Sequence, residues 1–241
     1  MPRPSFLVSL LGFVLLASPV LAHTAVEPVP RDAAWLKRHD SFVAIAAQGG
    51  VDVLFLGDSI TDGWRATGKA VWAREFAPLR AANFGIGGDR TQHVLWRLAN
   101  GEAQGIRPKA VVLLIGTNNT GLERDNVTVR NTVPETIAGI TAVVQSLRQR
   151  LPDAKILLLA VFPRADGAGD VPVRAQVTEV NQAIAKLHDG RHIHFLDIGA
   201  RFLAADGTVP TAIMPDKLHL SEEGYAIWAD AIRAPLAALL K

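Results

Sequence analysis

The feature of this sequence that most constrains its fold is a short apolar run, residues 51–56, that stops abruptly at Gly57, Asp58 and Ser59. Runs of this length that are rich in Val, Leu and Phe are typical of a strand buried on both faces of a parallel sheet. In open α/β sheets the ligand site lies just beyond the carboxyl ends of the strands. The run therefore predicts a functional site next to Ser59.

Three interpretations of Ser59 compete at this point. Asp58, Ser59 and Thr61 are residue types that cap the first turn of a helix, and capping alone accounts for their presence. Phosphate binding is the weakest interpretation, because neither G-x-G-x-x-G nor G-x-x-x-x-G-K-[ST] occurs here. The third is a nucleophile, which needs a histidine base, an orienting acid and hydrogen-bond donors for an oxyanion from elsewhere in the chain.

Apolar runs alternate with helical patterns along the rest of the chain. The predicted strands are 51–56, 80–83, 110–115, 155–161 and 192–197, and the predicted helices are 31–48, 71–76, 91–100, 131–151, 173–188 and 221–240. This order implies a parallel sheet with helices on both faces. Because crossovers are right-handed, we expect a three-layer α/β/α sandwich with a five-stranded parallel sheet, of flavodoxin-like topology.

The first 22 residues have the layout of a secretory signal: a basic start, a short apolar centre and small residues before a cleavage site after Ala22. We therefore predict a signal peptide at 1–22, an N-terminal segment with a helix at 23–50, and one domain at 51–241. Export to the periplasm or the extracellular space follows, without stable membrane insertion after cleavage. An uncleaved anchor is the alternative, and without cysteine the chain has neither disulfides nor a lipoprotein attachment site.

Composition is that of a globular domain, with 49% apolar and 20% charged residues and no visible repeat or low-complexity tract. The formal net charge is only +2. A charge this small argues against nucleic acid or an anionic membrane surface as a partner.

Donors for an oxyanion can be found after the second and third predicted strands. A glycine turn at 85–88 offers backbone N–H groups, and Asn118 offers a side-chain amide. Each also has a structural interpretation. The glycines allow a sharp bend beside the sheet, and an asparagine often bonds its own backbone in a turn.

A base must come from seven histidines, and His219 is the best placed. It lies in a predicted loop before the last helix, three residues after Asp216, so the acid can turn back onto its Nδ1 and leave Nε2 facing the serine. An acid and a histidine in a surface loop are common, however, so this pair is informative only together with Ser59, Gly88 and Asn118. His192 and His194 have no acid at ligand spacing, and we expect no metal there.

Four blocks of the sequence, 57–61, Gly88, 116–119 and 216–219, resemble those of the GDSL, or SGNH, hydrolases in the same order. The stretch 83–98 is similar almost throughout to the catalytic subunits of the intracellular platelet-activating-factor acetylhydrolases. The resemblance runs from about Val51 to Trp228. A single G-D-S is a weak signal, whereas four blocks in order are specific.

The resemblance implies that Ser59 is the nucleophile, His219 the base and Asp216 the acid that orients it. It further implies an oxyanion hole formed by the N–H groups of Ser59 and Gly88 and the side chain of Asn118. The glycine directly before the acid of the second block is the one that the family uses, which selects Gly88 from the turn.

These residues predict a secreted serine esterase that hydrolyses small, acetyl-type esters through an acyl-enzyme, with no metal and no cofactor. Ile60 and Leu218, next to Ser59 and His219, are expected to narrow the acyl pocket. The alternatives are a lipolytic enzyme or thioesterase for longer chains, and a non-catalytic glycan-binding module on the same fold, which would lack a catalytic residue. Acetylated glycans suit an exported enzyme, and an acetylated lipid suits the intracellular relatives.

Overall fold

A computed structural model describes residues 24–164 and 172–241, so the predicted signal peptide and His23 lie outside the described residues. A five-stranded parallel sheet forms the centre of the fold, with the order β2-β1-β3-β4-β5. Its strands are β1 Val53–Gly57, β2 Ala81–Gly85, β3 Ala110–Leu114, β4 Lys155–Leu159 and β5 Ile193–Leu196. This is the flavodoxin-like sandwich predicted from the sequence, and the prediction is confirmed.

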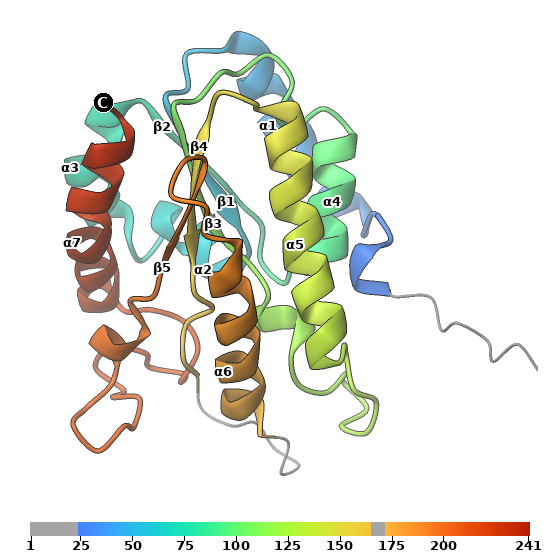
Figure 1. The fold of residues 1–241 in the computed structure, drawn as a ribbon, viewed down its shortest axis with the longest axis vertical. Helices are drawn as coiled ribbons and strands as arrows, with labels where there is room; N and C mark the ends of the chain where they lie inside the picture. Colours follow the sequence, from blue (N-terminus) through green and yellow to red (C-terminus); the bar gives the residue numbers. More distant parts are fainter. Residues whose placement is uncertain (1–23, 165–171) are drawn as a thin grey trace, which may run out of the picture.

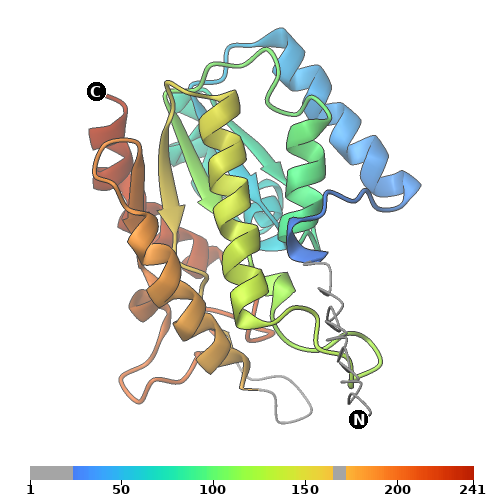
Figure 2. The same ribbon diagram turned by 45° about the vertical axis from the view of Figure 1, so that its right-hand side comes forward.

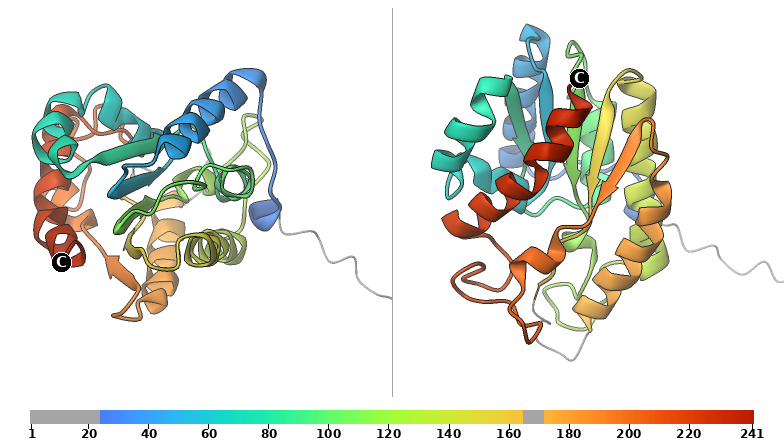
Figure 3. Two further views of the ribbon diagram at one scale, coloured as in Figure 1. Left: turned by 90° about the horizontal axis from the view of Figure 1, so that it is seen from above. Right: turned by 60° about the vertical axis from the view of Figure 1, so that its left-hand side comes forward.

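Helices cover both faces of the sheet (Figure 1). They are α1 Ala33–Gln48, α2 Ser59–Asp62, α3 Lys69–Glu75, α4 Thr91–Ala99, α5 Val133–Arg150, α6 Val173–Ile184 and α7 Glu222–Leu239. Helices α1, α4, α5 and α6 pack on one face, and α2, α3 and α7 pack on the other. Viewed from above, α7 and α5 therefore lie on opposite sides of the sheet (Figure 3).

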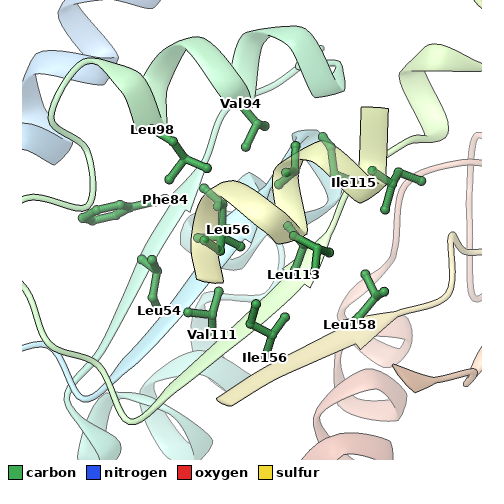
Figure 4. Close-up of a cluster of buried hydrophobic side chains, with 14 of the residues drawn as sticks. Leu54, Leu56, Phe84, Val94, Leu98, Val111, Leu113, Ile115, Ile156 and Leu158 are labelled. Atoms are coloured by element: carbon green, nitrogen blue, oxygen red, sulfur yellow. The ribbon is translucent and has the colours of Figure 1, made fainter. Parts of the chain in front are cut away.

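Alternate residues of the strands feed two separate hydrophobic clusters, because successive side chains of a strand point to opposite faces. Leu54 and Leu56 of β1 face α4 and α5 in the first cluster (Figure 4). Val53 and Phe55 face α7 in the second cluster, together with Trp64 and Trp228. Burial on both faces explains why the strands read as continuous apolar runs rather than as alternating ones.

The N-terminal segment packs into the same structure. Trp35 and Phe42 of α1 are buried in the first cluster, and the short 3-10 helix Thr24–Val26 packs against α4 and α5 (Figure 2). The side chain of Asp32 accepts a hydrogen bond from the Trp35 N–H and caps α1. Within residues 24–164 and 172–241, no helix is both long and apolar enough to cross a membrane.

Two features of the fold differ from the sequence prediction. A four-residue helix, α2, begins at Ser59, where a capped helix was one interpretation of the sequence but no helix was among the predicted elements. The Asp58 side chain accepts from the Ile60 N–H at its start. Residues 120–131 form an extended loop closed by a bridge between Leu122 and Val129, at the lower edge of Figure 1. Both depend on local polar contacts, which apolar periodicity does not report.

Candidate active site

Ser59, His219 and Asp216 lie together at the carboxyl edge of the sheet, although 160 residues separate the first two in sequence. Ser59 Oγ is 2.8 Å from His219 Nε2, and His219 Nδ1 is 2.6 Å from Asp216 Oδ2. With a carboxylate beside Nδ1, the neutral imidazole holds its proton on Nδ1 and leaves Nε2 free to accept the serine proton. The structure thus brings together the three groups that the sequence singled out.

The loop before α7 holds Asp216 and His219 in place through its own backbone. Asp216 Oδ1 accepts from the N–H groups of Leu218 and His219 at 3.0 and 2.6 Å. Lys217 has a φ of +64°, and its Nζ donates to the Val209 carbonyl at 2.7 Å. Partial burial raises the pKa of Asp216, but the hydrogen bonds from His219 and Leu218 outweigh it and hold that pKa below its usual value. The lowered pKa favours the ionised form of Asp216, which is the form that accepts a hydrogen bond from His219 Nδ1.

Glycines at the ends of β1 and β2 let the serine turn approach the sheet. A Cβ at Gly57 would lie 2.2 Å from the Leu114 carbonyl oxygen, and one at Gly85 would lie 2.2 Å from the Asp62 nitrogen. Both distances are far below any tolerated contact, so only glycine fits at either position. This close packing fixes the position of α2 and of Ser59 at its first residue.

Of the donors expected for an oxyanion, Gly88 lies in a turn beside the serine, and Asn118 is bonded to the residue that follows Gly88. Gly88 is exposed at a φ of +77°, and its N–H donates to no acceptor within residues 24–164 and 172–241. Asn118 uses one amide hydrogen to bond the Asp89 carbonyl oxygen at 2.9 Å and has a second hydrogen left to donate. A Cβ at Gly87 would lie 3.9 Å from Ser59 Cβ, which shows how near this turn is to the serine.

A buried ionic cluster beneath the site was not found from the sequence. The fully buried Arg97 forms ion pairs with Asp89, at 3.0 Å, and with Glu102. Its guanidinium also donates to the carbonyl oxygens of Phe84, at 2.8 Å, and Gly57, at 3.1 Å. One side chain thus connects the ends of β1 and β2 to the residue after Gly88. An arginine on the apolar face of the predicted helix 91–100 was the available signal.

One predicted pocket residue is wrong. Ile60 is 1% exposed and belongs to the hydrophobic cluster around Trp64, so its side chain does not reach the substrate side of Ser59. The reason is that α2 starts at Ser59 and turns the next side chain towards the core. Leu218 is partly buried at the edge of the same cluster, directly before His219, and its place in the acyl pocket stays a prediction.

The other histidines have different surroundings. His93 Nδ1 accepts from the Arg90 N–H, and burial together with the charges of Arg31, Arg90 and Arg97 lowers the pKa of His93 to about 4. His39 is buried in α1, where burial lowers its pKa. In the described part of the chain, no three His, Asp or Glu side chains are grouped so that they could hold a metal ion.

Comparison with known proteins identifies the family to which this fold and this site belong. A profile of the GDSL-like lipase/acylhydrolase family matches residues 55–227. Among solved structures, a GDSL-like lipase from Bacteroides thetaiotaomicron superposes with a TM-score of 0.65 at 20% identity, covering 84% of this chain and 97% of that one. An acetylxylan esterase from Geobacillus stearothermophilus gives 0.60 at 19% identity, covering 80% and 94%.

Curated relatives are much more similar in sequence. The platelet-activating factor acetylhydrolase IB subunit alpha1 of Homo sapiens is 40% identical over 224 residues, covering 92% of this chain and 91% of that protein. The alpha2 subunit of Rattus norvegicus is 38% identical over 211 residues, covering 87% and 86%. Both alignments extend beyond the predicted limits of the resemblance, 51–228. The chain belongs to the GDSL-like lipase/acylhydrolase family and is an ester-hydrolysing enzyme.

Proposed function

We propose that this enzyme is a serine esterase in which Ser59 is the nucleophile, His219 the base and Asp216 the acid that orients it. The observation that carries the proposal is the continuous contact from Ser59 Oγ to His219 Nε2 and from His219 Nδ1 to Asp216, at 2.8 and 2.6 Å. A serine hydroxyl needs such a base to become a nucleophile at neutral pH. With all three groups in contact, a non-catalytic module on this fold is disfavoured.

The reaction follows from this geometry. Ser59 Oγ attacks the ester carbonyl carbon while its proton passes to His219 Nε2, and the carbonyl oxygen becomes an oxyanion. That oxyanion accepts hydrogen bonds from the N–H groups of Ser59 and Gly88 and from the free amide hydrogen of Asn118. When the tetrahedral intermediate collapses, His219 gives the proton to the departing alcohol. Water then attacks the acyl-enzyme with the same proton transfers, and the acid is released from Ser59.

Small acyl groups, acetyl above all, are the proposed substrates. Two considerations support this choice: the relatives at 38 to 40% identity are named acetylhydrolases, and Leu218 lies directly before His219 at the edge of the core. Since Ile60 does not take part, Leu218 is the one of the two predicted pocket residues that remains to limit the acyl chain. Longer acyl chains on the same triad, as in a lipase or thioesterase, are the alternative outcome of the test below.

Export is also part of the proposal, and it rests on the basic start, apolar centre and small residues of 1–22. An exported enzyme meets acetylated glycans more readily than the lipids of a cell interior. The N-terminal sequence of the enzyme recovered from its native host tests this point. A mature chain that begins at His23 is expected, and a chain in the cytoplasm that retains Met1 or Pro2 would contradict it.

The test of the esterase proposal is hydrolysis of p-nitrophenyl esters from acetate to palmitate, with and without Ser59→Ala. We expect kcat/KM to be highest for acetate, and the variant to lose hydrolysis while it unfolds at the same urea concentration as the unaltered enzyme. Turnover of the variant at the normal rate would refute the role of Ser59. A preference for octanoate or longer would replace the small-acyl proposal with the lipase alternative.

A further inference from the structure

Arg31, in the segment that leads into α1, reaches the turn next to Ser59. Its Nη1 donates to the Gly87 carbonyl oxygen at 2.7 Å and to Asp89 Oδ1 at 3.0 Å. A Cβ at Gly88 would lie 3.3 Å from Nη1 and 3.4 Å from Nη2, so the guanidinium lies against the exposed Gly88. An arginine from outside the four sequence blocks thus borders the proposed oxyanion hole.

One edge of this guanidinium is open. In the described chain no oxygen accepts a hydrogen bond from Nη2 or Nε of Arg31, and the side chain is 30% exposed. These two groups form the side-on fork of an arginine, whose parallel N–H bonds match the two oxygens of a carboxylate or a phosphate. The fork is therefore available to a ligand at the mouth of the site.

Nearby acids neutralise the charge of Arg31 only in part. The Asp89 side chain is fully buried and is shared between Arg31, Arg97 and the indole N–H of Trp35. Glu102 pairs with Arg97 and not with Arg31, and burial raises the pKa of Glu102 to about 7.

The acid of the neighbouring loop that lies beside Arg90, Glu123, is already paired. Glu123 is bonded through both carboxylate oxygens to Arg90, at 2.6 and 2.7 Å, and Arg130 Nε lies 3.9 Å from the same carboxylate. Burial lowers the pKa of His93, and the positive charges of Arg31, Arg90 and Arg97 lower it further, because all three lie close enough to act on the same ring. A group of positive charges beside the turn favours a negatively charged ligand.

Building on the esterase function proposed above, we infer that Arg31 forms an anion subsite: the enzyme acts on esters whose alcohol portion carries a carboxylate or phosphate, held on the Nε and Nη2 edge beside Gly88. Arg31 is then a specificity residue. It binds the substrate while the serine, histidine and acid carry out the reaction.

The experiment compares three acetyl esters of one phenol series: methyl 4-acetoxybenzoate, which is neutral, 4-acetoxybenzoate and 4-acetoxyphenyl phosphate. Acetate release gives kcat/KM for the unaltered enzyme, Arg31→Gln, Arg31→Lys and the control Arg107→Gln. Arg107 is exposed in the loop before β3, at the opposite edge of the sheet, and its replacement changes the net charge equally. Each variant is compared with the unaltered enzyme on the same ester, so leaving-group chemistry cancels.

We expect Arg31→Gln to lower kcat/KM for the anionic esters by about 10- to 100-fold more than for the neutral ester, which is the range for losing hydrogen bonds to a charged group. Most of this loss should be in KM. Arg31→Lys, which keeps the charge without the fork, should lose less, and Arg107→Gln should show no such difference. Whether the carboxylate or the phosphate ester loses more tells which anion the fork fits. Added salt should reduce the difference in kcat/KM between the anionic and the neutral esters for the unaltered enzyme.

Equal losses for all three esters would overturn the inference and assign Arg31 to holding the turn, while leaving the esterase function intact. No hydrolysis of any ester by the unaltered enzyme would instead refute the proposed function, and this inference with it. If Arg31→Gln does not fold, competitive inhibition of the unaltered enzyme decides. We expect 4-hydroxybenzoate or phenyl phosphate to inhibit at least 10-fold more strongly than methyl 4-hydroxybenzoate, and equal inhibition would overturn the subsite.

Discussion

Asp58 directly precedes the proposed nucleophile, and its replacement by asparagine tests how the site is held. Asp58 is 1% exposed, its Oδ1 accepts from the Ile60 N–H at 3.0 Å, and its Oδ2 has no hydrogen-bond partner among the described residues. Burial raises its pKa from 3.8 to about 7, and the charge of Asp89 adds to the shift. Asparagine keeps the bond to Ile60 and has no proton to lose.

The sign of the expected effect follows from proton linkage. Between pH 4 and 7 the unfolded chain has released the Asp58 proton while the folded chain retains it, so raising the pH favours unfolding of the normal enzyme. Between the unfolded and the folded pKa, each pH unit lowers the free energy of unfolding of the normal enzyme by about 1.4 kcal/mol. From pH 5 to 8 the free energy of unfolding of Asp58→Asn should therefore gain roughly 2 to 3 kcal/mol relative to the unaltered enzyme.

Urea unfolding at pH 5, 6, 7 and 8 measures this difference for the two proteins side by side. Glu102 also titrates in this range, but it is present in both proteins and its contribution cancels. The exposed Asp153, replaced by asparagine, is the control for net charge and should give a flat difference. A flat difference for Asp58→Asn as well would show that the buried carboxyl is ionised throughout, and the reasoning from burial would be refuted.

Three further changes test the rest of the site. Asn118→Ala should lower kcat by roughly 10² to 10³ with little change in KM, the range for losing one oxyanion donor, and a change confined to KM would place Asn118 in substrate binding instead. Arg97→Lys keeps the charge, but an ammonium group cannot bond Asp89, Glu102 and two carbonyl oxygens at once. We therefore expect the free energy of unfolding, measured in urea, to fall by about 3 kcal/mol and kcat to fall as well. Normal unfolding and turnover would show that the cluster does not hold the site. Leu218→Ala should move the optimum of the p-nitrophenyl ester series to longer acyl chains. The change in discrimination between esters that differ by one methylene should not exceed about 1 to 3 kcal/mol, and an unchanged optimum would remove Leu218 from the acyl pocket.

Much of the fold could be predicted from the sequence because the strands are buried on both faces. Runs such as 110–115 contain almost no polar residue, and their alternation with helices leaves few topologies once crossovers are right-handed. The ends of elements were less certain, since they depend on single contacts. The predicted helix 173–188 becomes the α-helix Val173–Ile184 followed by a 3-10 turn, because hydrogen bonding tightens there.

The site was predictable as far as its residues carry a local pattern. Ser59, Gly88 and Asn118 each follow a strand, and Asp216 with His219 is a recognisable pair. Ile60 was placed wrongly because adjacency in sequence says nothing about direction once a helix begins at the serine. Arg31 was missed because its partners, Gly87 and Asp89, are 56 and 58 residues away in the chain. Arg97 was missed in the same way, since one of its partners, Gly57, is 40 residues away.

The residues of the site divide into an exposed set and a buried set, and the division has a physical reason. His219 and Asp216 are 44% and 56% exposed, so water and alcohol reach them freely, and their loop holds them through its own hydrogen bonds. The proposed oxyanion donors depend on the position of the backbone around them, because the backbone fixes where an N–H group points. Arg97 and Asp89, both fully buried, supply that rigidity at a desolvation cost that only mutual pairing offsets. Loss of either partner should therefore damage folding and turnover together, whereas changes at the exposed pair should damage turnover alone.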